Sequence, residues 1–334
     1  MYNSKIVGVG HYVPDNVVTN KDLEKLMDTS DDWIVERTGI RERRFVEKGS
    51  GDSPSTMGTK AARIAIEKAG LTPDDIDFII FATLSPDYYF PGPGVMVQEQ
   101  LGIKTIGALD VRNQCSGFIY AVSVADQFIK TGMYKNVLVI GAELHSGGLD
   151  ITTRGRGVSV IFGDGAGAVV MQATEEKNKG VLSTHLYSEG KYAEELSLIG
   201  PNTGNWVPEI IASEGEDLSY YPHMNGNFVF KNAVIRFQEA IHEALKTNGK
   251  TKDDIDLLIP HQANLRISQY IQKKLELPND KVYNNIMRYG NTTAASIPIA
   301  LSEALEEGKL KEGDTLCLAA FGSGFTWASA LINW

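Results

Sequence analysis

The sequence contains only two cysteines, Cys115 and Cys317, among 334 residues. Two cysteines are too few for a disulfide framework, and no C-x-x-C or H-E-x-x-H spacing points to a metal site. No run of about 18 apolar residues predicts a membrane span, and the first residues lack the basic and apolar regions of a signal peptide. We therefore expect a cytoplasmic enzyme that uses neither a metal ion nor a redox cofactor and does not bind a membrane.

Positive charge is also scarce. The formal net charge of −10 argues against nucleic-acid binding, because contact with a phosphate backbone requires a concentration of Lys and Arg. The glycine-rich run FGDGAG at 162–167 is followed by an apolar strand pattern, and no G-x-x-x-x-G-K-[ST] pattern occurs. We therefore exclude a dinucleotide site and a P-loop.

An internal repeat is the main feature that is present. Residues 72–80 (TPDDIDFII) resemble residues 251–259 (TKDDIDLLI) at an offset of 179 residues, and a helical pattern precedes each block at that offset. Each helical pattern stops at a glycine suited to a left-handed C-cap, Gly70 or Gly249. We infer two copies of one α/β unit, which divide the chain into halves at 1–175 and 176–334.

The repeat predicts both the fold and the meeting of residues from the two halves. Each copy alternates helical patterns with short apolar strands, as in a mixed, mostly parallel sheet with helices on both faces. Two such units would pack as five αβαβα layers. Ligands bind at strand ends in α/β sheets, so Cys115 of one half should lie close to His261 and Asn291 of the other.

These three side chains suit nucleophilic catalysis. Cys115 precedes an apolar helical pattern, whose N-terminus should lower the pKa of the thiol, whereas Cys317 lies in a strand pattern and is interpreted as inert. Alone, His261 would be a structural histidine and Asn291 a turn residue or helix cap. Together, thiol, imidazole and carboxamide supply a nucleophile and two hydrogen-bond donors for a developing oxyanion or enolate.

Four separated motifs carry a family resemblance. They are NQCSGF at 113–118, IPHQANLRI at 259–267, YGNTTAASIP at 289–298 and FGSGFTW at 321–327. Together they resemble the beta-ketoacyl-acyl-carrier-protein synthase III family of condensing enzymes. The resemblance runs through nearly the whole chain and implies a thiolase-like α/β fold and a homodimer.

The resemblance also implies a reaction. A short acyl-coenzyme A primer would condense with malonyl-acyl-carrier protein to give 3-oxoacyl-acyl-carrier protein and carbon dioxide, initiating fatty acid biosynthesis. Cys115 would carry the acyl group, and His261 and Asn291 would stabilise the malonyl-derived enolate. The backbone amides of Cys115, Ser323 and Gly324 would form the oxyanion hole. Coenzyme A is a substrate in this scheme, and no cofactor is expected.

Three further groups of residues follow from the family likeness. Coenzyme A would contact Thr29, Trp33, Arg37, Arg156, Asn227, Phe230 and Asn264, with its adenine between Trp33 and Arg37. Phe90 would lie at the dimer interface near the acyl pocket. An acidic carrier protein would dock on Lys231, Arg266, Lys273 and Lys274.

Two departures from the family pattern leave the preferred primer open. Ser323 stands where the pattern has glycine, although its backbone donor is kept, and the stretch 189–223 is longer than in compact members. This stretch would either cover the acyl tunnel or form a surface insertion.

Three alternatives remain at this stage. A related condensing enzyme of secondary metabolism would use quinolone or polyketide starters. A papain-like peptidase shares the order Cys, His, Asn but not the C-G-[SA]-C-[WY] context, which is absent here. A non-catalytic scaffold would keep the fold and form no acyl adduct.

Overall fold

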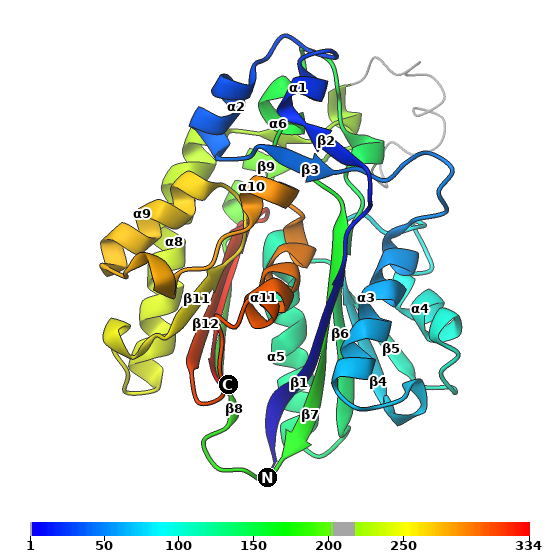
Figure 1. Ribbon diagram of the computed structural model, residues 1–334, viewed down its shortest axis with the longest axis vertical. Helices are drawn as coiled ribbons and strands as arrows, with labels where there is room; N and C mark the ends of the chain where they lie inside the picture. The colour runs from blue at the N-terminus through cyan, green and yellow to red at the C-terminus, as the bar shows by residue number, and fades with distance from the viewer. Residues whose placement is uncertain (1, 201, 203–217) are drawn as a thin grey trace.

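The strands form two large sheets in the computed structural model, which describes residues 2–200, 202 and 218–334 (Figure 1). Part of the long stretch 189–223 therefore lies outside the described residues. The first sheet has the order β1-β7-β6-β4-β5 and the second β11-β12-β13-β8. The first contains β1 (Asn3–Tyr12), β4 (Phe78–Ala82), β5 (Gly107–Val111), β6 (Asn136–Glu143) and β7 (Gly165–Thr174). The second contains β8 (Gly180–Ser188), β11 (Leu257–Pro260), β12 (Thr315–Gly322) and β13 (Thr326–Asn333).

Helices separate and cover the two sheets, so that the molecule has five layers (Figure 1). The outer face of the first sheet packs on α3 (Pro54–Lys68) and α4 (Pro93–Leu101). Between the sheets lie α5 (Gly117–Lys130) and α11 (Ser296–Glu306). The outer face of the second sheet packs on α8 (Gly226–Thr247) and α9 (Leu265–Leu275). The layered α/β architecture expected from the sequence is confirmed.

Smaller elements gather at one end of the molecule, at the top of Figure 1. Four are short helices: α1 (Asn20–Leu23), α2 (Asp31–Thr38), α6 (Arg156–Ser159) and α10 (Ile286–Tyr289). The others form two antiparallel ribbons. In one, β2 (Val17–Thr19) pairs with β3 (Glu42–Arg44), and in the other, β9 (Leu196–Ser197) pairs with β10 (His223–Met224). None of the described helices is both long and apolar enough to cross a membrane.

The offset of 179 residues recurs in the elements themselves. β6 and β12 correspond residue for residue, and so do the 3₁₀ turns η2 (Gln114–Ser116) and η8 (Thr293–Ala295). Each turn has a non-glycine residue in the left-handed region at the same position, Gln114 with φ 45° and Thr293 with φ 49°. The two turns pack against each other between the sheets, which places Cys115 beside the loop that carries Asn291.

The sheets are mixed rather than mostly parallel, so that part of the sequence-based expectation is wrong. β4 pairs in parallel with β5 and β6, and β11 with β12, but the other pairs of both sheets are antiparallel. β12 and β13 are joined by residues 323–325 alone, and so short a connection permits only an antiparallel pair. A strand buried on both faces has the same apolar pattern in either direction, so the sequence does not reveal this difference.

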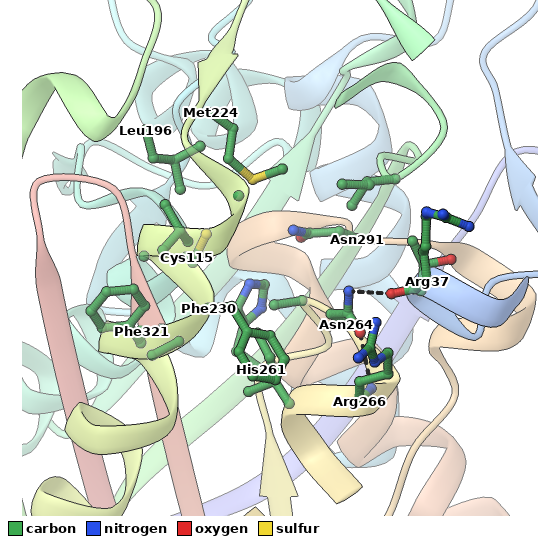
Figure 2. A pocket seen from close by; sticks show the side chains of 18 of the residues that line it. Arg37, Cys115, Leu196, Met224, Phe230, His261, Asn264, Arg266, Asn291 and Phe321 are labelled. Atoms are coloured by element: carbon green, nitrogen blue, oxygen red, sulfur yellow. Dashed lines mark hydrogen bonds between the residues drawn. The ribbon is translucent and has the colours of Figure 1, made fainter. Parts of the chain in front are cut away.

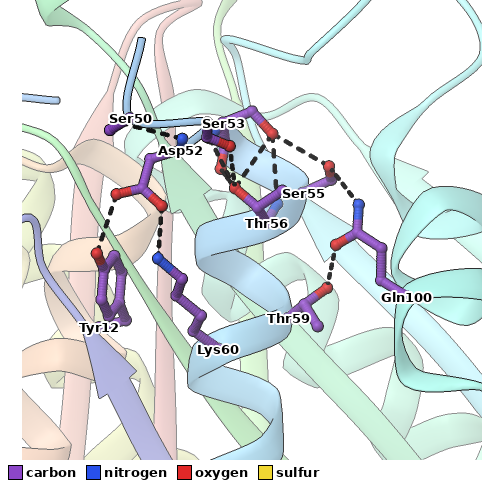
Figure 3. Close-up of polar contacts among 10 residues, drawn as sticks. Tyr12, Ser50, Asp52, Ser53, Ser55, Thr56, Thr59, Lys60 and Gln100 are labelled. Carbon is purple, nitrogen blue, oxygen red and sulfur yellow. Dashed lines mark hydrogen bonds and ion pairs between the residues drawn. The ribbon is translucent and has the colours of Figure 1, made fainter. Parts of the chain in front are cut away.

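The outermost layer of the first half is fixed by a polar network at the start of α3 (Figure 3). Ser53 and Thr56 form a capping box, in which each side chain accepts the backbone N–H of the other. Asp52 accepts a hydrogen bond from Tyr12 of β1 at 2.9 Å and pairs with Lys60 of α3 at 2.6 Å. The N-terminal half of α3 is thereby tied to the first sheet.

Candidate active site

A cavity of about 500 Å³ lies between the two halves and is lined by residues of both. Cys115, His261 and Asn291 all line it, and Figure 2 shows them around one space with Arg37 and Arg266 on its opposite side. The structure therefore brings the three predicted catalytic residues together from η2, the end of β11 and the loop before η8.

Cys115 lies directly against the turn between β12 and β13. A Cβ atom at Gly322 would lie 2.5 Å from Cys115 Cβ and 2.8 Å from its Sγ, so no larger residue fits there. The backbone N–H groups of Ser323 and Cys115 lie near the sulfur and favour its ionised form. Two of the three predicted oxyanion-hole amides thus lie at the nucleophile, and the Gly324 amide lies one peptide further along the turn.

Burial dominates the ionisation of Cys115. Loss of solvation, with a smaller contribution from the charge of Glu143, raises the pKa of the thiol to about 12, while the two amides lower it by less. The lowered pKa expected from the helix N-terminus is therefore wrong. A helix terminus stabilises a nearby thiolate by up to about 2 kcal/mol. Full burial can raise the pKa of a thiol by as much as ~5 units, which is the larger effect. The thiol is thus protonated at neutral pH and must lose its proton as it reacts.

Glu143 is a second buried ionisable group near the nucleophile. It ends β6 and accepts hydrogen bonds from Thr83 Oγ1 at 3.1 Å, from Ser85 Oγ at 2.6 Å and from the backbone N–H groups of Leu84 and Ser85. Burial raises the pKa of this carboxyl to about 7 despite these donors. Sequence reasoning missed Glu143 because one acidic residue at the end of an apolar strand forms no pattern.

Ser296 contacts one ring nitrogen of His261. Ser296 Oγ accepts the N–H of Gln262 at 3.3 Å and lies 2.6 Å from Nδ1 of His261, and we assign its hydroxyl proton to the bond with that nitrogen. The ring proton therefore belongs on Nε2, an assignment made from the hydrogen-bond network. Nε2 is buried with no hydrogen-bond partner among the described residues, and burial lowers the pKa of His261 to about 3. The site thus contains a neutral N–H donor without a partner.

Asn291 supplies a second donor. Its backbone is fixed by hydrogen bonds with Ile161 and Gly163 at 2.8 and 3.1 Å. Its Oδ1 accepts the N–H of Thr293 at 2.8 Å, which leaves the side-chain amide nitrogen to donate. Neutral donors in a buried pocket stabilise a developing enolate without solvent reorganisation.

Five of the seven residues expected to hold coenzyme A line this cavity: Trp33, Arg37, Asn227, Phe230 and Asn264. Arg156 is not among the lining residues, but its guanidinium lies 5.3 Å from the centre of the Trp33 ring. Thr29 is also outside the lining, and its buried hydroxyl has no hydrogen-bond partner within the described chain. The guanidinium of Arg37 lies 4.5 Å from the Trp33 ring. An adenine between them needs about 7 Å, two van der Waals contacts, so Arg37 must move for it to enter.

The remaining predicted residues lie further out. Phe90 is 74% exposed, between β4 and α4, and is not part of the cavity lining. The four predicted docking cations are all exposed, and Arg266 also lines the cavity mouth. Within the described residues, none of the four lies within ion-pair distance of a carboxylate; they are Lys231, Arg266, Lys273 and Lys274.

Comparisons with known proteins agree with this arrangement. Sequence models described as 3-oxoacyl-[acyl-carrier-protein (ACP)] synthase III and as its C-terminal part match residues 109–190 and 245–334. Beta-ketoacyl-[acyl-carrier-protein] synthase III 1 of Vibrio vulnificus strain YJ016 is 48% identical over 330 residues, which cover 99% of each chain.

Solved structures give the same picture. The crystal structure of 3-oxoacyl-[acyl-carrier-protein] synthase III from Aquifex aeolicus superposes with a TM-score of 0.90 at 45% identity and covers 99% of this chain and 100% of that one. The priming beta-ketosynthase from the R1128 polyketide biosynthetic pathway superposes with a TM-score of 0.88 at 32% identity, and the match covers 99% of this chain and 96% of that one.

Proposed function

The chain belongs to the 3-oxoacyl-[acyl-carrier-protein] synthase III family, and we propose on this premise that Cys115 is the residue on which its acyl group is extended. The protein is an acyltransferase of the condensing type, and it joins an acyl-coenzyme A primer to malonyl-acyl-carrier protein. One observation carries the assignment of residues: a thiol and two neutral N–H donors, from Cys115, His261 and Asn291, line one buried cavity.

In the first half-reaction, the sulfur of Cys115 attacks the thioester carbon of the primer. We assign the developing oxyanion to the amides of Cys115 and Ser323, which lie beside the sulfur to which this carbon becomes bonded. The bond to coenzyme A then breaks. The proton of the Cys115 thiol leaves on the coenzyme A sulfur, so no net proton is released.

In the second half-reaction, malonyl-carrier protein enters the same cavity and loses carbon dioxide. The enolate oxygen accepts hydrogen bonds from Nε2 of His261 and the side-chain amide of Asn291. The enolate carbon attacks the acyl group, and Cys115 leaves as a thiolate that takes up a proton. The assigned tautomer suits this role, since His261 donates throughout and need not change protonation state.

The alternatives are less well supported. A cysteine peptidase needs a histidine that takes up the thiol proton, but burial lowers the pKa of His261 to about 3, which disfavours the imidazolium. A starter enzyme of secondary metabolism shares the fold, yet the polyketide ketosynthase is 32% identical whereas the synthases of Vibrio and Aquifex are 48% and 45% identical.

The exposed cations of α9, together with Lys231, form the proposed carrier-protein surface. Arg266 links this surface to the cavity, since its guanidinium lies 5.9 Å from the ring of Phe230 and both residues line the mouth. Cations without an acidic partner are available to an acidic protein, which they would attract over a short range.

A homodimer is proposed from the open edge of the first sheet. β5 is the last strand of that sheet, and Leu109 on it is 37% exposed. An uncovered edge strand exposes unpaired backbone groups, and pairing with the same strand of a second copy would satisfy them. Tyr88 and Phe90, 57% and 74% exposed, follow the neighbouring β4. Light scattering should give twice the mass of one chain, and a fully active monomer would contradict the proposal.

The proposed function is tested by separating the two half-reactions. Incubation with acetyl-coenzyme A should add one acetyl group, detected by intact-protein mass spectrometry. Adding malonyl-carrier protein should then release the acyl group as 3-oxoacyl-carrier protein. A strict preference for malonyl-coenzyme A would contradict the carrier-protein assignment, and the absence of any acyl adduct would contradict the synthase assignment itself.

A further inference from the structure

The side chain of Ser323 links the oxyanion turn to a wall of the cavity. Its hydroxyl donates a hydrogen bond to the backbone carbonyl of Leu196. Leu196 begins β9 and pairs with Met224 of β10, and both side chains line the cavity. Figure 2 shows Leu196 and Met224 on the side of the cavity where Cys115 lies.

The rest of the Ser323 residue is fixed at the nucleophile. Its N–H lies near the sulfur of Cys115, and its carbonyl accepts a hydrogen bond from Thr326 Oγ1 at 3.1 Å. The preceding residue, Gly322, is packed against Cys115. The wall at Leu196 is thus one hydrogen bond away from the peptide that contacts the reactive sulfur.

This link is specific to the side chain. The backbone donor of Ser323 would be present with any residue at this position, whereas the contact with Leu196 needs a hydroxyl. Other contacts of this wall act on its other residues. Glu189 and Phe325 exchange two backbone hydrogen bonds at 2.8 and 3.1 Å, the N–H of Asn225 donates to the carbonyl of Glu195 at 2.8 Å, and the ring of Tyr192, just before β9, lies 5.4 Å from that of Phe325. Such ring contacts tolerate sliding, whereas a hydrogen bond fixes the position of one carbonyl.

We propose that Ser323 is a positioning residue for primer selection, whose hydroxyl holds Leu196 against the acyl group carried on Cys115. The inference rests on the proposed function. While the hydrogen bond is present, Leu196 limits the space beside the thioester and short primers are favoured. Without it, the carbonyl of Leu196 loses this anchor, the side chain of Leu196 can shift outward, and longer primers gain relative to acetyl.

The test compares Ser323→Ala and Ser323→Gly with a matched control. Ser329→Ala removes the same type of bond, from a serine hydroxyl to the carbonyl of Ala240 at 2.7 Å, in the same sheet but away from the cavity lining. For each protein, kcat/KM is measured with acetyl-, butyryl-, hexanoyl- and octanoyl-coenzyme A. The readout is the ratio of each longer primer to acetyl, which a general loss of stability or activity does not change.

We expect the hexanoyl-to-acetyl ratio to rise about threefold to tenfold in both Ser323 variants, the effect of one hydrogen bond, and to stay unchanged in Ser329→Ala. An unchanged ratio in the Ser323 variants, with a wild type that loads acetyl normally, overturns this inference alone. The same holds if Ser329→Ala shifts the ratio equally. A wild type that loads no primer overturns the proposed function and the inference with it.

Discussion

Replacement of Cys115 by alanine should abolish acyl loading and condensation, with a loss on the order of 10⁶-fold in turnover, as for the removal of other catalytic nucleophiles. The cavity has no substitute nucleophile at this point, because Gly322 and the amides of the β12–β13 turn surround the sulfur. Intact-protein mass spectrometry after incubation with acetyl-coenzyme A should show one adduct on the wild type and none on the variant.

Cys317→Ala is the matched control for this experiment. Cys317 is fully buried in β12 and, unlike Cys115, is not among the residues that line the cavity, so a thioester bound there does not reach its thiol. The control should load acetyl at the wild-type rate. An acetyl adduct that persists in Cys115→Ala, or that disappears in Cys317→Ala, would contradict the assignment. Decarboxylation of malonyl-carrier protein should survive in Cys115→Ala, since both enolate donors remain.

The fold was accessible from the sequence because it is duplicated. The two copies share strand positions and helix stops, and these features follow from local rules on apolar periodicity and left-handed glycines. The match extends to the turns that hold Cys115 and Ala294, so the meeting of the halves could be inferred as well. The direction of the strands could not be inferred, because it depends on the connections between strands rather than on their composition.

The parts of the site that sequence reasoning missed all depend on packing. Ser296 orients His261 across 35 positions of the chain, and Glu143 contacts the loop after β4 across about 60. No local pattern marks either contact. Leu196 and Met224 reach the cavity from a ribbon of two residues per strand, too short to show any periodicity.

The pKa of Cys115 could not be predicted from the sequence either. The helix terminus that suggested a reactive thiolate is present, but a sequence does not report how completely a side chain is buried. At an exposure of 7%, desolvation outweighs the helix, so thiol reactivity should keep increasing with pH beyond pH 9 instead of reaching a plateau near 8.5.

His261→Ala and Asn291→Ala should each retain acyl loading and lose malonyl decarboxylation by about 10² to 10³-fold, the usual effect of removing one donor from a developing oxyanion. Loading is spared because its oxyanion is bound by backbone amides, which neither substitution removes. Single-turnover acetyl transfer and release of carbon dioxide from malonyl-carrier protein measure the two steps separately.

His185→Ala is the control for the loss of a partly buried histidine, since His185 contacts Ser183 in β8 at 3.0 Å and is not part of the cavity lining. It should leave both steps unchanged. Slower loading in His261→Ala would mean that the imidazole also takes the thiol proton, which contradicts the assigned Nε2–H tautomer. Ser296→Ala, which frees the ring of His261 to adopt either tautomer, separates the two possibilities. If the imidazole takes the thiol proton, this variant should load acetyl faster. If His261 only donates to the enolate, the variant should load acetyl normally and lose decarboxylation activity alone.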